Sequence, residues 1–296
     1  MTSEITLFVN PTAGRGRGAH AAQPAASALR AAGFSVRTVL GSDADDALAR
    51  ARTAVEGGTG ALIAVGGDGM AHLALQAVAG TRTPLGVIAV GTGNDFARSL
   101  GLPVRDPEAA GRVAAEALKG ARLREVDLGL AGGRWFGTVL ASGFDSRVND
   151  RGNRMRWPAG RFKYDLAMLA ELASFKPFPF RIALDDGPER EIEATLVAVG
   201  NGTSYGGGMR ICPGAEQDDG LFDIRVVGDC SRTTLVKVFP QVYKGTHVEH
   251  PEVTVHRAAK ITLAAAGITG YADGEPLGTL PLTAECVPGA VRVLAL

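Results

Sequence analysis

The stretch ALIAVGGDGMAHLALQAV, residues 61–78, has the pattern of a strand, a glycine turn and a helix in succession. Its first five residues are apolar, as in a buried strand, and the residues after Gly69 resume an apolar pattern that is typical of a helix. Between them the chain turns through three glycines and the carboxylate of Asp68. Such a turn can hold a bulky anion, because its backbone N–H groups are accessible and no Cβ stands in the way. A plain strand-to-helix turn is the alternative.

The segments on either side continue this alternation of strand and helix. Short apolar runs that alternate with helices form parallel strands with right-handed crossovers. The N-terminal part is therefore predicted to be an α/β domain with a mostly parallel sheet that is covered on both faces. Strands are predicted at 5–10, 34–40, 61–65 and 84–90, and helices at 19–33, 42–58, 70–80 and 106–120.

Three glycine-containing loops follow strands of this sheet, at 10–18, 66–69 and 91–94. In open parallel sheets, ligands bind beyond the carboxyl ends of the strands, so we expect the three loops to converge on one cleft. No lysine follows any of them as in the Walker pattern GxxxxGK[ST], and the GxGxxG dinucleotide fingerprint is not matched. The loops therefore predict a phosphate site outside those two classes.

The sequence changes character near residue 125. From there, short apolar runs joined by Gly-Gly and Asp-Gly turns predict an antiparallel, β-rich, sandwich-like domain. Helical segments are expected at about 160–175 and 232–244. We predict two domains, 1–124 and 125–296, with the active site in the cleft between them and a last strand that can return to the N-terminal domain.

Composition excludes several classes of function. Lys and Arg together number 31 and so do Asp and Glu, so no overall field draws the 296-residue chain to nucleic acid. Three scattered cysteines do not form a disulfide framework and fit a reducing compartment. No apolar run approaches the length of a membrane span, and the N-terminus lacks the pattern of a signal peptide. We expect a soluble, cytoplasmic protein.

Six motifs, taken in their order along the chain, resemble the diacylglycerol kinase catalytic-domain family, specifically its soluble bacterial lipid kinases. That family is related to sphingosine kinases and more distantly to NAD kinases. The resemblance implies an enzyme that uses ATP and Mg²⁺ and transfers the γ-phosphoryl group of ATP to the hydroxyl of diacylglycerol or a related lipid. The motifs are FVNPTAGRGRG, AVGGDGMAHLALQAV, PLGVIAVGTGNDFARSLGLP, VDLG, CPGAEQDDGLFDI and YADGEPL.

The resemblance also implies which residues contact ATP. The family usually has threonine after GGDG, whereas this sequence has Met70, so one hydroxyl contact to the nucleotide is lost there. The implied ATP contacts are Asn10, Thr38, Gly66, Gly67, Asp68, Gly69, Met70, Ala71, His72, Thr92, Gly93, Asn94 and Asp95.

The resemblance implies a magnesium site from the motifs VDLG and CPGAEQDDGLFDI. Magnesium ligands correspond to Asp219, the backbone carbonyls of Glu216 and Leu221, and the acidic position Asp127. A simple Asp-Gly turn is the alternative at DDGLFD.

The base corresponds to Glu275, with Asp68 and Asp273 as further catalytic acids. In an extended backbone Asp273 and Glu275 share one face, whereas in a turn around Gly274 they diverge. A hairpin corner with solvated acids is the alternative here.

A basic and aromatic stretch, residues 145–178, suits a membrane interface. We expect it to form a lip through which the lipid substrate is drawn from the membrane, with transient membrane association; a solvated loop that leads into a core helix fits equally well. Oligomeric state is not fixed by the sequence, and a homodimer remains open. The residues are Arg147, Arg151, Arg154, Arg156, Trp157, Arg161, Phe162, Lys163 and Tyr164.

Two other functions remain open at this point. One is a kinase for a soluble alcohol such as NAD, which the VNPTAG loop and the late DGE disfavour. The other is a nucleotide-binding regulator without turnover, which Met70 keeps open.

Overall fold

The computed structural model of the chain describes residues 4–9, 13–144, 146–148, 151 and 177–295. The chain divides into two compact units, each of which is described by itself. Unit 1 reaches Leu128, beyond the predicted boundary at residue 124, and also includes two later segments. Unit 1 comprises Met1–Leu128, Gln217–Asp219 and Val287–Leu296, and unit 2 comprises Gly129–Glu216 and Gly220–Cys286.

Unit 1 contains the predicted parallel sheet. Its strands run in the order β4-β3-β1-β2, all parallel, and the end of β15 (Leu282–Leu294) joins β4 in parallel through Val293 and Leu85. The strands are β1 (Glu4–Val9), β2 (Ser35–Leu40), β3 (Leu62–Gly66) and β4 (Leu85–Ala89). The helices are α1 (Ala13–Ala31), α2 (Ala44–Glu56), α3 (Asp68–Val78), α4 (Asp95–Ser99) and α5 (Pro107–Gly120).

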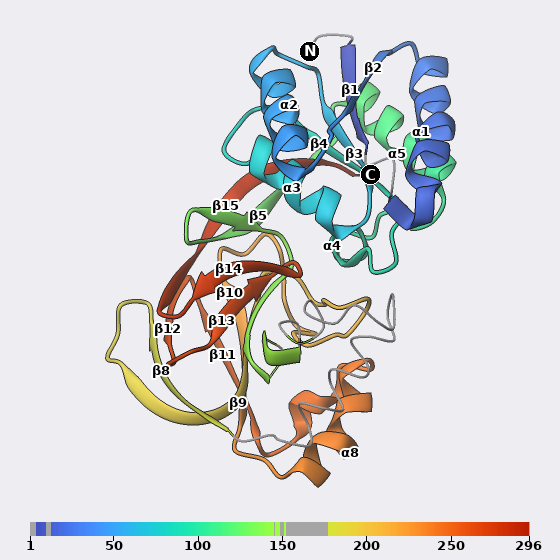
Figure 1. The fold of residues 1–296 in the computed structure, drawn as a ribbon. Coiled ribbons are helices and arrows are strands. Elements are labelled where there is room, and N and C mark those ends of the chain that lie inside the picture. Colours follow the sequence, from blue (N-terminus) through green and yellow to red (C-terminus); the bar gives the residue numbers. More distant parts are fainter. Residues whose placement is uncertain (1–3, 10–12, 145, 149–150, 152–176, 296) are drawn as a thin grey trace. The chain divides into compact units, whose positions relative to one another are not determined.

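Helices cover both faces of this sheet, as the apolar strands require. Figure 1 shows α2 and α3 on one side of β1–β4 and α1 and α5 on the other. Ile5, Leu7 and Val9 of the central strand are buried in one core with Ala25 and Leu29 of α1. This three-layer arrangement confirms the predicted α/β architecture.

Helix α1 begins earlier than predicted. The glycines of residues 13–18 predicted a loop, but these residues form the first turns of a helix that continues to Ala31. Glycine disfavours a helix by only about 1 kcal/mol per residue, and tertiary packing outweighs this local preference. The prediction of a glycine loop at 10–18 is therefore wrong for residues 13–18, and residues 10–12 lie outside the described residues.

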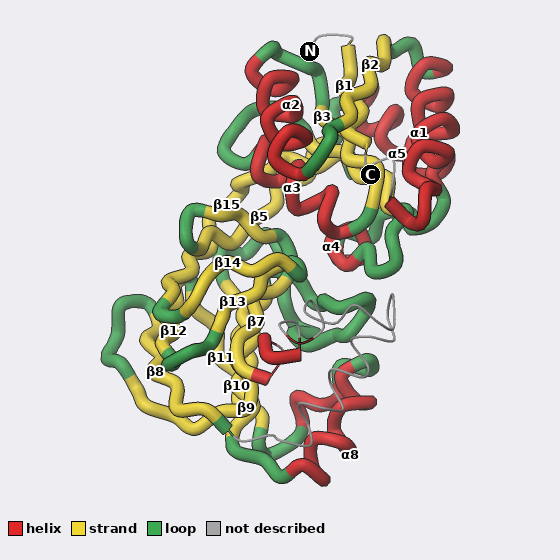
Figure 2. Tube along the Cα trace, viewed as in Figure 1, coloured by secondary structure: helices red, strands yellow, loops and turns green. Residues whose placement is uncertain are grey.

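Unit 2 consists mainly of strands (Figure 2). These strands pair antiparallel, which confirms the predicted β-rich domain. Its strands are β6 (Arg134–Phe136), β7 (Val139–Gly143), β8 (Phe178–Leu184), β9 (Arg190–Gly200), β10 (Phe222–Gly228), β11 (Val253–Ala258), β12 (Lys260–Ala264), β13 (Thr269–Ala272) and β14 (Glu275–Thr279), and β5 (Leu123–Ala131) begins in unit 1 and ends in unit 2.

The helical segments of unit 2 include α8 (Arg232–Val242) and the 3₁₀ helix η1 (Thr246–Glu249), and residues 144, 146–148 and 151 are helical as well. Helix α8 confirms the prediction at 232–244, whereas the predicted segment at 160–175 lies outside the described residues. In the described part of the chain, no helix combines the length and the apolar composition needed to cross a membrane.

The core of unit 2 holds apolar rings and neutral thiols. The rings of Phe136 and Phe222 stack with centroids 5.7 Å apart. Cys212, Cys230 and Cys286 are buried and form no disulfide. Burial raises the pKa of the Cys212 thiol to about 12, so this cysteine is a neutral core group at physiological pH.

Helices α1 and α5 pack so closely that one contact requires glycine. A Cβ on Gly111 of α5 would lie 2.8 Å from Ala25 Cα of α1, a backbone atom that cannot move aside. A Cβ on Gly120 of the same helix would lie no closer than 3.2 Å to the flexible side chain of Arg122.

Gly111→Ala is therefore expected to lower the free energy of unfolding. Overpacking costs about 1–3 kcal/mol, which exceeds the gain of about 1 kcal/mol in helix propensity. Gly120→Ala is the matched control and should leave stability unchanged or raise it, as measured by chemical denaturation of both variants. A stabilised Gly111→Ala variant would contradict the close packing.

Candidate functional site

The loops that follow β3 and β4 meet backbone to backbone. A Cβ on Gly67 would lie 3.2 Å from Gly91 Cα, and a Cβ on Gly91 would lie 2.4 Å from Gly67 Cα. The Val90 amide also donates to the Gly66 carbonyl at 2.8 Å. Glycine is thus required at Gly67 and Gly91 because the two loops approach each other. Two of the three predicted loops therefore do converge at the carboxyl edge of the sheet.

The carboxylate of Asp68 holds these loops together. Its Oδ2 accepts a hydrogen bond from the Asn94 amide at 2.7 Å, and its Oδ1 accepts one from the Asp95 amide at 2.6 Å. Asp68 therefore binds the first amides of α4 and compensates the positive end of that helix. In this structure Asp68 is a positioning residue, and its predicted contact with phosphate or metal stays a prediction.

Asn94 fixes the turn from within. Its backbone is left-handed, with φ of 61°, a conformation that asparagine tolerates better than most residues. Its side chain accepts a hydrogen bond from the Gly91 amide at 2.8 Å and donates one to the Gly91 carbonyl at 3.0 Å. Asn94 is buried, so its side chain shapes the loop.

The exposed side of the paired loops is suited to an anion. Gly69 and Thr92 are exposed, and among the described residues the Gly69 amide meets no acceptor. Arg98 Nε donates to the Gly93 carbonyl at 3.0 Å, and Arg105 Nη2 donates to the Thr92 carbonyl at 2.9 Å. A helix N-terminus and two guanidinium groups together favour phosphate.

Arg98 and Arg105 were not among the predicted site residues. The available signal was the position of Arg98 in the short helix directly after GTGND. Arg105 gave no comparable signal, because it reaches the loop only through the folding of residues 100–105 back toward the end of β4, where its amide donates to the Ala89 carbonyl at 2.7 Å.

Other predicted ATP contacts occupy different environments. Met70, Ala71 and His72 are buried in α3, and the amides of Met70 and Ala71 donate to the Gly67 carbonyl. These side chains lie in the core, so any contact of α3 with a nucleotide would come from the backbone amides of its first turn. Thr38 is exposed on the edge strand β2, two residues before its end at Leu40. Asn10 lies outside the described residues.

The predicted magnesium ligands divide into two groups. Asp219 and the carbonyls of Glu216 and Leu221 supply only oxygen atoms, the donor set that Mg²⁺ prefers, so their chemistry fits the ion. Asp127 is buried, its amide donates to the Gln217 carbonyl at 2.7 Å, and its Oδ1 accepts from the Gly289 amide at 2.7 Å. Asp127 thus anchors the segment that carries Asp219.

The side chains alone form no metal cluster in the described ranges. No group of three or more His, Cys, Asp or Glu side chains there could hold a metal ion. A site at Asp219 would therefore depend on backbone carbonyls, as the resemblance implied, and it stays a prediction.

The segment ADGE forms a tight hairpin turn between β13 and β14. Asp273 and Gly274 both have positive φ, 53° and 87°, and Ala272 pairs with Glu275 across the turn. The structure thus has the turn and not the extended alternative. Such positive φ at both central residues is typical of two-residue hairpins.

The two acids of this hairpin have different surroundings. The Asp273 carboxylate accepts hydrogen bonds from the Gly137 amide at 2.9 Å, the Thr138 amide at 2.8 Å and Thr138 Oγ1 at 2.5 Å. The Glu275 side chain is exposed, and its carboxylate has no hydrogen-bond partner among the described residues, whereas its backbone pairs with Ala272. Asp273 therefore positions the hairpin, while the carboxylate of Glu275 remains available for chemistry.

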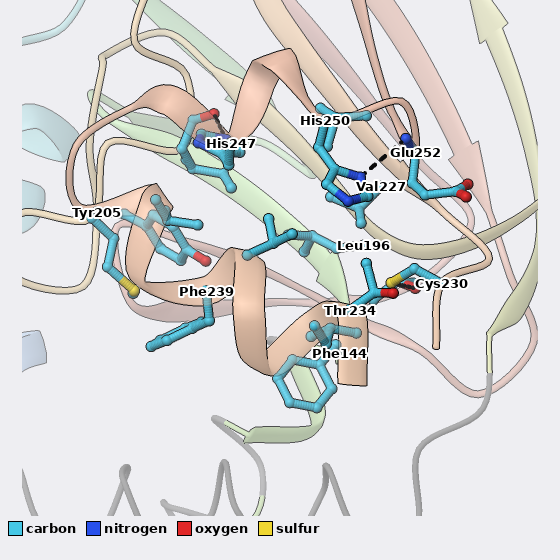
Figure 3. A pocket seen from close by; sticks show the side chains of 17 residues that line it. Phe144, Leu196, Tyr205, Val227, Cys230, Thr234, Phe239, His247, His250 and Glu252 are labelled. Carbon is cyan, nitrogen blue, oxygen red and sulfur yellow. Dashed lines mark hydrogen bonds between the residues drawn. The ribbon is translucent and has the colours of Figure 1, made fainter. Parts of the chain in front are cut away.

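An apolar pocket lies in unit 2 between α8 and the sheet. It encloses a cavity of about 60 Å³. Figure 3 shows Leu196 and Val227 of the sheet beside α8, with Phe144 and Phe239 among the rings that line the pocket. Cavities with such lining stay dry and take apolar ligands.

His247 is a buried, titratable residue of this pocket, which Thr195 also lines. Its Nε2 lies 3.0 Å from the Ile211 carbonyl, which can only accept, so Nε2 carries the proton and Nδ1 is an acceptor. Within the described residues, Nδ1 has no hydrogen-bond partner. Burial lowers the pKa of His247 below its usual value, and the nearby charge of Arg225 acts in the same direction.

The predicted membrane-facing stretch lies mostly outside the described residues, including Arg154, Arg156 and Trp157. Of its named side chains, Arg147 and Arg151 are described and both are exposed, and the guanidinium of Arg147 lies 4.7 Å from the centre of the Phe178 ring. This is a cation–π contact within unit 2.

Comparison with known proteins identifies the family. Residues 4–131 match the diacylglycerol kinase catalytic domain, and residues 138–295 match the YegS C-terminal NAD kinase beta sandwich-like domain. A diacylglycerol kinase of Mycobacterium tuberculosis is 45% identical over 98% of this chain and 94% of its own length. The chain belongs to the diacylglycerol kinase family. It is therefore a lipid kinase by family, as the six motifs predicted.

Further members of the diacylglycerol kinase family agree in sequence and fold. The diacylglycerol kinase of Staphylococcus saprophyticus is 29% identical over 95% of this chain and 92% of its own length. A crystal structure of a diacylglycerol kinase from Bacillus anthracis str. Sterne matches with a TM-score of 0.75 and 25% identity, over 99% of this chain and 97% of that chain.

The fold extends beyond this family. An NAD kinase from Archaeoglobus fulgidus, solved in complex with ATP, matches with a TM-score of 0.56 and 13% identity, over 98% of this chain and 92% of that chain. At that identity the likeness concerns the fold alone.

Asp68→Asn is expected to lower the free energy of unfolding by about 1–3 kcal/mol, because one carboxylate oxygen becomes an NH₂ group that faces a backbone N–H. Asp43→Asn is the matched control. Asp43 caps α2 through the Asp46 amide at 2.9 Å, and asparagine caps a helix about as well as aspartate. Equal losses in chemical denaturation of the two variants would contradict the role of Asp68.

The stability of the protein should fall as the pH drops below about 6.5, the usual pKa of histidine. The folded-state pKa of His247 lies below the unfolded-state value, so the unfolded state binds the proton more tightly. Between pH 7.5 and 5.5, the wild type should lose more unfolding free energy than His247→Gln. Identical losses would show that His247 is not buried as a neutral ring.

Proposed function

We propose that the protein is an ATP- and magnesium-dependent kinase that transfers the γ-phosphoryl group of ATP to the hydroxyl of diacylglycerol or a related lipid. The observation that carries this proposal is the pair of glycine loops joined by Asp68 at the carboxyl edge of the parallel sheet. The proteins named diacylglycerol kinase among its relatives support the acceptor.

In this proposal the triphosphate binds at the exposed side of the paired loops. The amide of Gly69 and the backbone around Thr92 would donate to phosphate oxygens, and Arg98 and Arg105 would offset their charge. Asp219 and the carbonyls of Glu216 and Leu221 would hold Mg²⁺. When bound, the ion neutralises charge on the transferring phosphoryl group.

Glu275 is proposed as the general base. Its carboxylate would take the proton of the lipid hydroxyl while that oxygen bonds to the γ-phosphorus and the bond from the γ-phosphorus to the bridging oxygen of ADP breaks. The products are the lipid phosphate and ADP. The exposure of Glu275, and the fixed hairpin that Asp273 provides, support this assignment.

The apolar pocket beneath α8 is proposed to take the end of an acyl chain. The surface of its lining is almost entirely apolar. Moving a hydrocarbon chain from water into such a cavity is favourable, because apolar surface is removed from water. This supports a lipid acceptor over a soluble alcohol.

Purified protein with γ-labelled ATP and Mg²⁺ should transfer label to dioctanoylglycerol, giving an organic-extractable product. Sphingosine and NAD serve as separate acceptors in parallel reactions. Label in NADP would replace the proposal by a kinase for a soluble alcohol, and binding of ATP without transfer to any acceptor would favour a non-catalytic regulator.

Glu275→Gln is expected to lower kcat about 10²- to 10⁴-fold, because the carboxylate that accepts the proton is removed. Glu191→Gln, which changes another exposed strand glutamate of unit 2, is the control and should keep wild-type activity. A Glu275→Gln variant with full activity would remove the assignment of the base.

A further inference from the structure

Helix α8 presents two apolar faces. Leu235, Val238, Phe239 and Val242 point to one side and line the pocket in unit 2. Val242, which is 9% exposed, is nevertheless the only residue of the helix that is classed as buried. An ordinary surface helix covers a core with one face and shows polar residues on the other. The outer face of α8 departs from that pattern.

The outer face carries an apolar stripe in solvent. Val236, Pro240 and Tyr243 follow one another at the spacing i, i+4, i+7, which places them on one side of the helix. The exposed fraction is 56% for Val236 and 39% for Tyr243, two of four large hydrophobic residues exposed in the described part of the chain. The Tyr243 ring packs edge-on against Phe239 with centroids 6.1 Å apart, which holds it at the surface.

Cations flank this stripe. Arg232 and Lys237 of α8, and Lys244 just after its end, are all exposed. Residues 231–248 contain no acid, and the nearest ones in sequence are the exposed Asp229 and Glu249, beyond either end of the helix. Exposed apolar residues between lysines and arginines are the pattern of a helix that lies in the interface of an anionic membrane.

We infer that the outer face of α8 docks the protein on the surface of an anionic lipid membrane, with Val236, Pro240 and Tyr243 at the level of the headgroups. The inference rests on the proposed function, since an enzyme that acts on a membrane lipid has to bind the membrane that holds it. It assigns membrane contact to residues 232–244, whereas the sequence pattern had assigned it to residues 145–178.

Charge complementarity favours a membrane over a second copy of the chain. Two outer faces of α8 that met across a twofold axis would bring like charges together, because each carries three cations and no acid. An anionic bilayer instead offers negative charge to Arg232, Lys237 and Lys244 and an apolar interior to the stripe between them.

Co-sedimentation of the full-length protein with sucrose-loaded vesicles tests the inference. Vesicles of phosphatidylcholine alone are compared with vesicles that contain 30 mol% phosphatidylglycerol, on the order used to mimic an anionic leaflet. Wild-type protein should bind the anionic vesicles preferentially. Lys237→Gln/Lys244→Gln should weaken partitioning about 25-fold, given about fivefold per lysine near an anionic surface.

Two matched controls separate this surface from general effects of charge and polarity. Lys119→Gln/Arg122→Gln removes two positive charges from unit 1 and is the control for Lys237→Gln/Lys244→Gln. Val255→Ser is the control for Val236→Ser, because Val255 on β11 is also largely exposed, at 49%. Both controls should bind as the wild type does. Equal loss of vesicle binding in the α8 variants and their controls would overturn the inference. So would wild-type protein that binds anionic vesicles no better than vesicles of phosphatidylcholine alone.

Two further readouts make each outcome decisive. Light scattering should show the same mass for wild type and Val236→Asp; a dimer that Val236→Asp converts to monomer would identify α8 as a self-interface and overturn the inference. The α8 variants should keep activity on dioctanoylglycerol presented in solution. Vesicle binding without transfer of label to any lipid would leave the docking surface standing and reject the proposed kinase activity.

Discussion

The hydrogen bonds from the Asn94 and Asp95 amides to the Asp68 carboxylate are the interaction on which the rest of the site depends. Hydrogen bonds to a charged acceptor are stronger than neutral ones, and here both carboxylate oxygens are used. Together with the contact between Gly67 and Gly91, they fix two loops from neighbouring strands as one surface. If a triphosphate binds here as proposed, the amides and guanidinium groups of this surface would need little rearrangement, and such preorganised donors are the form of catalysis that phosphoryl transfer relies on.

In unit 2, some residues hold the backbone in place while neighbouring residues expose their side chains. Asp273 is held by the Gly137 and Thr138 amides, so that the neighbouring Glu275 stands on a rigid turn with its own carboxylate exposed. Helix α8 covers an apolar pocket with one face and leaves an apolar, cationic stripe on the other. In the two proposals above, one face of this short helix contacts the lipid chain and the other contacts the membrane, because cations flank the apolar residues of the outer face only.

The sequence predicted the parallel sheet well, because strands such as Leu62–Gly66 are buried on both faces and read as continuous apolar runs. It misplaced the start of α1, because the glycines of residues 13–18 favour a loop by local propensity, whereas the helix begins at Ala13. The hydrogen bond from the Asn94 amide to Asp68 joins residues 26 positions apart on different loops, and no local sequence pattern predicts such a contact. At ADGE the sequence left a turn and an extended strand open, and the positive φ of Asp273 decides between them. The family motifs supplied the kinase function, which periodicity and composition alone did not.

Hydrogen–deuterium exchange with and without saturating ATP and Mg²⁺ reports on both loops in one experiment. If the Asp68-linked loops form one nucleotide-binding surface, peptides that cover Gly66–Met70 and Gly91–Asp95 should gain protection together at the same ATP concentration. Protection of only one of the two loops, or calorimetric binding of ATP with neither loop protected, would contradict the account.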